Sequence, residues 1–144
     1  MKISLKRLNQ GLHFEAQNEL GKSVFFDAQP SEGGLGEGLA FSPMQTLLAS
    51  LAACSVFDVV LILNKKRQQL IDIKVEAEGK RAASGSAKPF ESINLHYKLF
   101  GKLNHEHAAQ AVKLGVEKYC SVAESLSKNI VITHSFEIFE SQSE

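Results

Sequence analysis

The feature that most constrains the fold is a long segment, residues 42–69, with no Gly and, after Pro43, no further Pro. Ser42 is a favourable N-cap, Pro43 suits the first helical turn, and Gln45 completes a Ser-x-x-Gln capping box. The segment therefore predicts a helix that begins at Pro43. Its middle is apolar on almost all sides, which is typical of a helix enclosed by protein.

A chain of 144 residues has little protein with which to enclose such a helix. A second subunit would supply the rest, most simply in a twofold homodimer. The apolar run from Leu47 to Leu63 is slightly short of the ~20 residues that a membrane span needs. Asp58, near its centre, would cost ~3 kcal/mol in lipid. We therefore expect a buried helix of a soluble protein, with no membrane partner.

The remaining patterns predict strands around two helices. Alternating residues and turns near Asn9 and Gly21 indicate a three-stranded meander in the first thirty residues, followed by a flexible glycine-rich connector. The later elements are a hairpin (71–78 and 93–99), a helix from Asn104 to about Ser127, and a strand (130–138). The order βββ-α-ββ-α-β predicts one α+β domain, residues 1–144, with two central helices against a mostly antiparallel sheet.

Charge and composition exclude several partners. Sixteen basic and sixteen acidic side chains cancel, so no long-range field attracts nucleic acid or an anionic membrane. The charged N-terminus is not followed by the apolar stretch of a signal peptide. We therefore expect a cytoplasmic protein, in which thiols are kept reduced and a paired cysteine is more often catalytic than structural.

Two cysteines, Cys54 and Cys120, each lie in a strongly helical run. If the two helices pack side by side, the chain carries a buried dithiol and thiol redox chemistry becomes its predicted function. If they do not meet, both cysteines are core packing, the commoner role of buried Cys. Cys54 lies about three turns into its helix, too far for the helix dipole to activate it. Cys120 lies further still along its own helix.

Other chemistry has weaker support. His105 and His107 do not share a helix face and no Cys-x-x-Cys is present, so we predict no metal site and no cofactor. His96 is expected on the polar side of its strand and His134 on the apolar side as a satisfied core residue. The absence of a Gly-x-Ser-x-Gly motif leaves a serine hydrolase unsupported.

Two segments resemble one known family. Ser42-Pro-Met-Gln-Thr-Leu-Leu-Ala-Ser-Leu-Ala-Ala-Cys54 is similar to the first-cysteine helix of the OsmC/Ohr family, and Glu117-Lys-Tyr-Cys-Ser-Val to its second-cysteine helix. The likeness is greatest to the general OsmC-like redox protein branch, and the element order fits as well. The resemblance implies an intertwined homodimer with two active sites at its interface.

In the peroxidase members of that family the first cysteine attacks an organic hydroperoxide and becomes a sulfenic acid, which the second cysteine resolves as a disulfide. A dithiol then restores the pair. Carried over by position, Cys54 would be the peroxidatic residue and Cys120 the resolving one. The implied partners are a small hydrophobic or peroxide substrate and a dithiol reductant.

The activating pair of the peroxidase members has no counterpart here. Those members follow the helix-opening Pro with a Glu that orients an Arg over the thiolate, whereas Met44 follows Pro43 here and Gln45 is uncharged. Neither Arg7 nor Arg81 matches the activating position. Charge-assisted contacts of this kind contribute ~1.5–3 kcal/mol, so we expect slower peroxide turnover or a different substrate. Glu32 or Glu37 is a candidate substitute for the orienting carboxylate.

Two rival functions are left open. One is a non-catalytic dimer that binds a small hydrophobic ligand in an interfacial pocket near the start of the long helix. The residues that would line it are Met44, Gln45, Leu47 and Leu48. The other is a protein that retains the fold alone, with both cysteines as packing.

Overall fold

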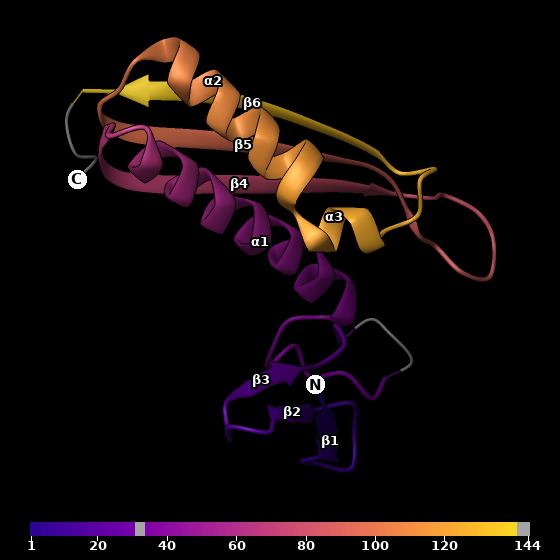
Figure 1. Ribbon diagram of the computed structural model, residues 1–144. Coiled ribbons are helices and arrows are strands. Elements are labelled where there is room, and N and C mark those ends of the chain that lie inside the picture. The colour runs from indigo at the N-terminus through magenta and orange to yellow at the C-terminus, as the bar shows by residue number, and fades with distance from the viewer. Residues whose placement is uncertain (31–33, 141–144) are drawn as a thin grey trace. The chain divides into compact units, whose positions relative to one another are not determined.

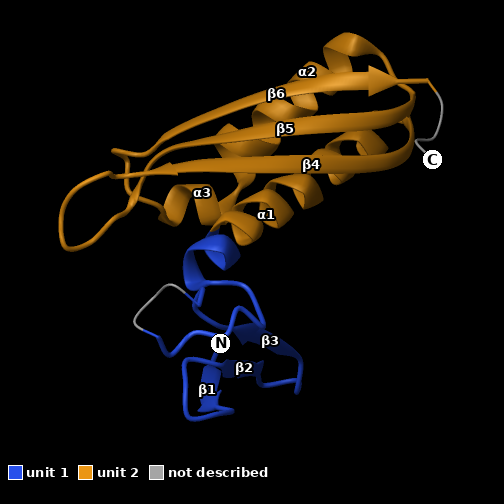
Figure 2. Ribbon diagram, turned by 180° about the vertical axis from the view of Figure 1, so that it is seen from behind, with its two compact units in different colours: residues 1–47 blue, residues 48–144 orange. Residues whose placement is uncertain are grey.

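A computed structural model describes residues 1–30 and 34–140. The chain divides into two compact units, residues 1–47 and residues 48–144 (Figures 1 and 2). Both units combine helix and strand, and the α+β class is confirmed, with the predicted order of strands and long helices. The strands form two separate three-stranded sheets, β1-β2-β3 and β4-β5-β6.

The first unit is the predicted antiparallel meander. Its strands are β1 (Ile3–Arg7), β2 (Phe14–Asn18) and β3 (Ser23–Phe26). The turn between β2 and β3 contains Gly21 at φ 73°, and the Asn18 side chain accepts hydrogen bonds from the backbone N–H groups of Leu20 and Lys22, each 2.9 Å long. An Asn side chain that bonds the following backbone in this way is a common device of tight turns.

The glycine-rich connector is bound to this sheet through Asp27, a contact that the sequence pattern did not predict. The buried Asp27 carboxylate accepts hydrogen bonds from the backbone N–H groups of Ala28 (2.7 Å), Glu37 (3.3 Å) and Leu39 (3.1 Å). These bonds hold the pKa of Asp27 below its usual range, with the Leu39 bond the largest cause. Gly36 approaches so closely that a Cβ atom there would lie 2.4 Å from the Ala28 carbonyl oxygen.

The long helix α1 (Pro43–Lys65) begins as predicted. The Ser42 N–H donates to the Gln45 side chain (2.8 Å) and the Gln45 N–H donates to the Ser42 hydroxyl (3.3 Å), which completes the capping box. The helix ends at Lys65, and the chain turns at Arg67 with φ 54°. The Gln68 N–H donates back to the Leu63 carbonyl (3.0 Å), the pattern of a Schellman cap, in which Gly is the usual residue.

The second unit is a mixed sheet with helices on one face (Figures 1 and 2). Its strands are β4 (Gln69–Arg81), β5 (Phe90–Lys102) and β6 (Val131–Phe139). β4 and β5 form the predicted antiparallel hairpin, and β6 pairs with β5 in parallel. The fully buried side chains come from the inner faces of α1, β5 and the second helix; among them are Leu51, Val59, Leu63, Ile93, Leu95, Tyr97, Leu99, Ala108, Ala111 and Val112.

Within the described chain α1 is buried on one face, and Phe57 and Leu61 on another are 67% and 55% exposed. The expected enclosure of this helix by a second subunit stays a prediction. α1 retains the length and apolar composition of a membrane span, while its buried face packs within the second unit. The alternation of apolar residues predicts that Ile71 shares a strand face with Ile73. This expectation is wrong, because Ile71 lies at a register shift between Leu70 and Asp72 and is exposed.

The second predicted helix is also different. It is divided into α2 (His105–Leu114), a π-helical turn η1 (Gly115–Tyr119) and a short α3 (Ser121–Ser125), where a continuous helix to about Ser127 was expected. The predicted Asn104 cap is present, since its side chain accepts a 3.1 Å hydrogen bond from the His107 N–H. The break falls at Cys120, whose backbone is extended.

Candidate active site

The structure brings the two cysteines together. Cys54 lies on α1 and is half-buried; Cys120 lies between η1 and α3 and is buried. Both are free thiols, and Cys54 is a hydrogen-bonding neighbour of the Cys120 sulfur. The Cys120 Sγ also lies 3.9 Å from the Leu51 carbonyl oxygen on α1. The spatial requirement for a dithiol is therefore met within the second unit.

Close approach of two helical segments places the thiols side by side. A Cβ atom added to Gly115, the first residue of η1, would lie 2.9 Å from Val59 Cγ2 and 3.1 Å from the Ser55 carbonyl oxygen. Only a residue without a side chain fits this approach without displacing α1. The contact lies on α1 directly beyond Cys54, so it fixes the separation between the two cysteine-bearing segments.

The π-helical turn and the break after it orient Cys120. The residue adopts φ −67° and ψ 101°, outside the helical region, and is the N-cap of α3. Its Sγ accepts a 3.4 Å hydrogen bond from the Ala123 N–H, the role that a Ser or Asp oxygen usually performs at an N-cap. π-turns occur frequently at functional sites. The expectation that Cys120 lies inside a continuous helix is wrong.

The environment keeps the Cys120 thiol protonated. Burial is the largest influence and raises its pKa to about 11, the neighbouring Cys54 acts in the same direction, and the Ala123 N–H opposes them. Cys120 is therefore a poor first nucleophile at neutral pH, because the thiolate is the reactive form. Of the two thiols, the half-buried Cys54 is the one that an external oxidant reaches more readily.

A second buried polar pair lies next to the thiols, and sequence reasoning did not identify it. The Tyr97 hydroxyl donates a 2.6 Å hydrogen bond to Ser55 Oγ, which donates a 2.9 Å bond to the Ala52 carbonyl. Burial raises the pKa of Tyr97 to about 12, and the nearby Cys120 contributes in the same direction. A polar Ser in an apolar helix and a Tyr on the inner face of a strand were the available signals.

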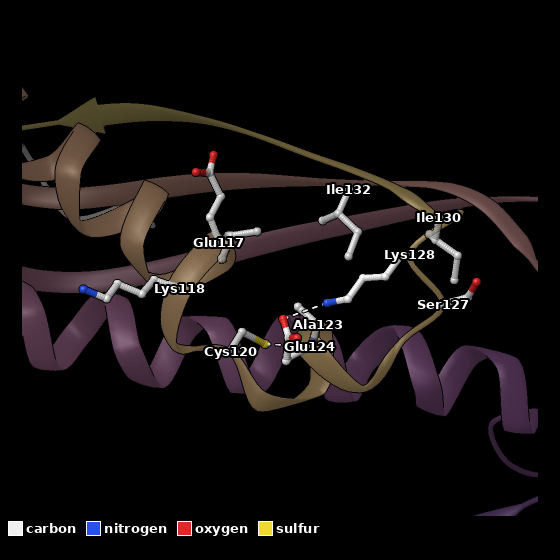
Figure 3. A pocket seen from close by; sticks show the side chains of 10 residues that line it. Glu117, Lys118, Cys120, Ala123, Glu124, Ser127, Lys128, Ile130 and Ile132 are labelled. Atoms are coloured by element: carbon white, nitrogen blue, oxygen red, sulfur yellow. Dashed lines mark hydrogen bonds and ion pairs between the residues drawn. The ribbon is translucent and has the colours of Figure 1, made fainter.

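A pocket of about 240 Å³ opens beside Cys120 (Figure 3). Its apolar lining comes from η1, from α3 and from the residues at and just before the start of β6, and its charged side chains are largely exposed. The lining residues with Cys120 are Val116, Glu117, Lys118, Ala123, Glu124, Ser127, Lys128, Ile130 and Ile132. The buried thiol thus borders a space that is partly open to solvent.

The residues predicted to bind a ligand lie at the start of α1. Met44, Leu47 and Leu48 are half-buried on the first turns of α1, and the exposed Gln45 forms the capping box. Their ligand-binding role stays a prediction. Glu37 accepts a 2.9 Å hydrogen bond from the Asn9 side chain, while Glu32 lies outside the described residues.

The arginines outside the end of α1 bind carbonyl groups near them in sequence. The Arg7 guanidinium donates to the carbonyl oxygens of Gly11 (Nε, 2.8 Å) and Gln10. The Arg81 Nε donates to the Lys88 carbonyl at 2.8 Å.

Two of the histidines have polar partners distant in the sequence. The His107 ring pairs with the Gln68 side chain (2.9 Å), and His134 Nε2 lies 3.1 Å from a Glu117 carboxylate oxygen. His134 lies on the inner side of β6 and has a partner, as expected, but it is half-buried and not part of the core. Within residues 1–30 and 34–140 no cluster of three His, Cys, Asp or Glu side chains has metal-binding geometry.

Comparison with known proteins agrees with the fold and the cysteine segments. Residues 36–135 match the family described as OsmC-like protein. Protein YhfA of Escherichia coli K12 is 38% identical over 130 residues, which cover 90% of this chain and 92% of YhfA. A hypothetical protein from Aquifex aeolicus VF5 has a crystal structure with a TM-score of 0.77 and 33% identity, covering 96% of this chain and 97% of that one.

A more distant structural neighbour has the same fold. The organic hydroperoxide resistance protein OsmC from Legionella pneumophila has a TM-score of 0.70 at 21% identity, covering 95% of this chain and 97% of that chain. The match to the family covers most of the chain and includes both cysteines. On this evidence the chain belongs to the OsmC-like protein family.

Proposed function

We propose that this protein is a thiol-dependent redox protein that reduces organic hydroperoxides through Cys54 and Cys120 as part of oxidative-stress defence. The observation that carries the proposal is the contact between two free thiols of unequal burial. Family membership supports a redox or peroxide-resistance role. The proposal includes a cytoplasmic homodimer, a small hydrophobic peroxide as substrate and a dithiol as reductant.

The unequal burial of the two thiols supports Cys54 as the attacking residue and Cys120 as the resolving one. The Cys54 thiolate attacks the terminal peroxide oxygen, the O–O bond breaks, and the departing alkoxide takes a proton to give the alcohol. Cys54 is then a sulfenic acid. The Cys120 sulfur displaces the hydroxyl group, its proton leaves with that group as water, and a Cys54–Cys120 disulfide forms. A buried, protonated Cys120 suits the second step, because it does not compete for peroxide in the first.

Single-cysteine variants test this proposal. Reduced protein is mixed with cumene hydroperoxide in the presence of a dithiol, and peroxide loss is followed. Wild type should turn over repeatedly and Cys54→Ser should lose the protein-dependent rate. Cys120→Ser should form a sulfenic acid that dimedone traps and should form no intramolecular disulfide. Equal rates for wild type and Cys54→Ser would exclude the peroxidase function.

A second candidate function has its own supporting observation. The first unit contains an apolar pocket of about 530 Å³, lined by Ile3, Leu5, Leu12, Phe14, Ala16, Phe26, Asp27, Ala28 and Pro43. Its size and lining suit a small hydrophobic ligand. Under this alternative an apolar ligand should raise the melting temperature equally in wild type and in Cys54→Ser, and the thiols should be unreactive toward peroxide.

A further inference from the structure

We propose that the reducing thiol enters through the pocket beside Cys120 and attacks the Cys120 sulfur of the oxidised protein. The mixed disulfide then forms on Cys120, and Cys54 is the leaving group. This inference rests on the proposed function, since it concerns how the Cys54–Cys120 disulfide is reopened. It assigns the oxidant and the reductant to different sulfur atoms of the same pair.

The pocket provides the approach. It is bordered by Cys120, and its apolar lining residues are Val116, Ala123, Ile130 and Ile132; Figure 3 shows the last three with Cys120. At about 240 Å³ it is smaller than the ~300–1,000 Å³ typical of sites for drug-sized ligands. A short aliphatic dithiol therefore suits the pocket in both size and lining, and this class of compound is the reductant.

The formal charges of the side chains that line this pocket cancel. Lys128 and Glu124 form a 2.8 Å ion pair in which both side chains are largely exposed, and Glu117 faces His134 at 3.1 Å. Lys118 Nζ lies over the Tyr119 ring. The lining thus contains two lysines and two glutamates, which favours a neutral thiol over a strongly charged one.

The direction of attack also follows from the leaving groups. A thiol that attacks Cys54 must expel Cys120 into the buried site where the pKa of that thiol is raised to about 11. A thiol that attacks Cys120 expels Cys54, which is only half-buried. Disulfide exchange is faster when the departing sulfur is the more stable thiolate. The pocket and the leaving-group preference therefore both favour attack on Cys120 Sγ.

The reductant reopens the disulfide in two exchange steps. The first reductant thiolate forms a bond to Cys120 Sγ, the Cys54–Cys120 bond breaks, and its electron pair goes to Cys54. The second thiol of the reductant loses its proton to water and attacks the first reductant sulfur. The electron pair passes to Cys120 Sγ, and the released Cys54 and Cys120 sulfurs each take up a proton. The dithiol loses two electrons and becomes a cyclic disulfide, and the protein regains two thiols.

Trapping the intermediate tests the inference directly. The disulfide of the wild-type protein is formed with diamide, so that the experiment does not depend on peroxide turnover. A brief pulse of 2-mercaptoethanol is quenched with N-ethylmaleimide, and mass spectrometry of the peptides locates each modification. We expect mercaptoethanol on Cys120 and maleimide on Cys54. The reverse pattern would overturn the inference, as would failure of diamide to join the two cysteines.

A pocket-filling variant provides an independent test with a matched control. Ala123→Leu places a larger side chain in the pocket, while Ser121→Leu places it on an exposed position of the same short helix. We expect dithiothreitol to reduce the disulfide of Ala123→Leu about tenfold more slowly than wild type, and that of Ser121→Leu within about twofold. Oxidation of the thiols by cumene hydroperoxide should be unchanged in the control Ser121→Leu, whose side chain is exposed outside the pocket lining.

The two readouts separate the inference from the proposed function. If peroxide fails to oxidise the wild-type thiols but mercaptoethanol is still trapped on Cys120, the peroxidase function is excluded and the inference stands. Normal peroxide oxidation with trapping on Cys54, or equal reduction rates for Ala123→Leu and Ser121→Leu, would overturn the inference alone.

Discussion

The Tyr97 hydroxyl and the Ser55 hydroxyl are joined by a 2.6 Å hydrogen bond in the core, and Ser55 directly follows Cys54 in the sequence. Tyr97→Phe should lower the free energy of unfolding by about 1 kcal/mol, the usual net value of such a bond. Chemical denaturation measures the change. Tyr119→Phe is the matched control, since Tyr119 is 49% exposed. Equal effects of the two substitutions would show that the buried bond contributes nothing to stability.

The raised pKa of Cys120 predicts a distinct pH profile for its alkylation. The rate of iodoacetamide modification at Cys120 should continue to rise above pH 9.0, the ordinary value, and level off near its pKa of about 11. Peptide mass spectrometry in wild type follows each cysteine separately. A Cys120 profile that levels off at or below pH 9.0 would contradict the buried environment described for this thiol.

The same shift has a consequence for stability. The pKa of Cys120 is higher in the folded protein than in the unfolded one. The free energy of unfolding therefore keeps its full value below about pH 9 and decreases as the pH rises towards about 11. The free energy of unfolding should therefore fall across this window, and should fall less in Cys120→Ala. Tyr97, whose pKa is raised from 10.0 to about 12, adds a similar loss at slightly higher pH.

Gly115→Ala tests whether the close approach to α1 controls the thiol pair. The new methyl group would lie 2.9 Å from Val59 Cγ2, and such overpacking costs ~1–3 kcal/mol, against ~1 kcal/mol gained from the helix propensity of Ala. We expect a net loss of about 1 kcal/mol and disulfide formation about tenfold slower. Val59→Ala in the same chain should restore much of the rate. An unchanged rate in Gly115→Ala would separate the helix contact from the chemistry.

The exposed apolar face of α1 predicts the proposed homodimer. Phe57 is 67% exposed on this face, and a twofold partner would bury it. Phe57→Glu should weaken dimerisation at least ~100-fold, because an unpaired carboxylate is costly to bury. Analytical ultracentrifugation measures the association. Leu20→Glu, at a turn position that is 83% exposed, is the control. A wild-type protein that is monomeric at micromolar concentration would exclude this assembly.

Residues with strong local preferences made much of the fold predictable. The start of α1 followed from Ser42 and Gln45, whose side chains form the predicted capping box. The end of α1 could not be predicted, because Arg67 occupies the left-handed position at which Gly is the usual signal. Ile71 was misplaced because a register shift in the hairpin leaves no mark on the alternation of residues.

The pairing of two thiols at the candidate site was predictable, but the geometry around them was not. The residues around Cys54 and Cys120 identified both thiols through a family resemblance. The π-turn that ends at Cys120 contains no Pro, and its helical residues keep the apolar spacing of an α-helix, so the break was not visible. The Tyr97–Ser55 pair and the pocket beside Cys120 arise from segments distant in sequence, and only the folded chain brings them together.

The parallel pairing of β5 and β6 has a consequence for the thiol on the connection between them. A chain that leaves one strand and returns parallel to it must cross the sheet, and here residues 103–130 make that crossing with Cys120 in their path. Detachment of the final strand would release the whole crossing segment, and the sulfur with it. A truncation that removes Val131–Phe139 should thus separate the two thiols while leaving both cysteines in the chain, so the strand after Cys120 holds its sulfur near Cys54.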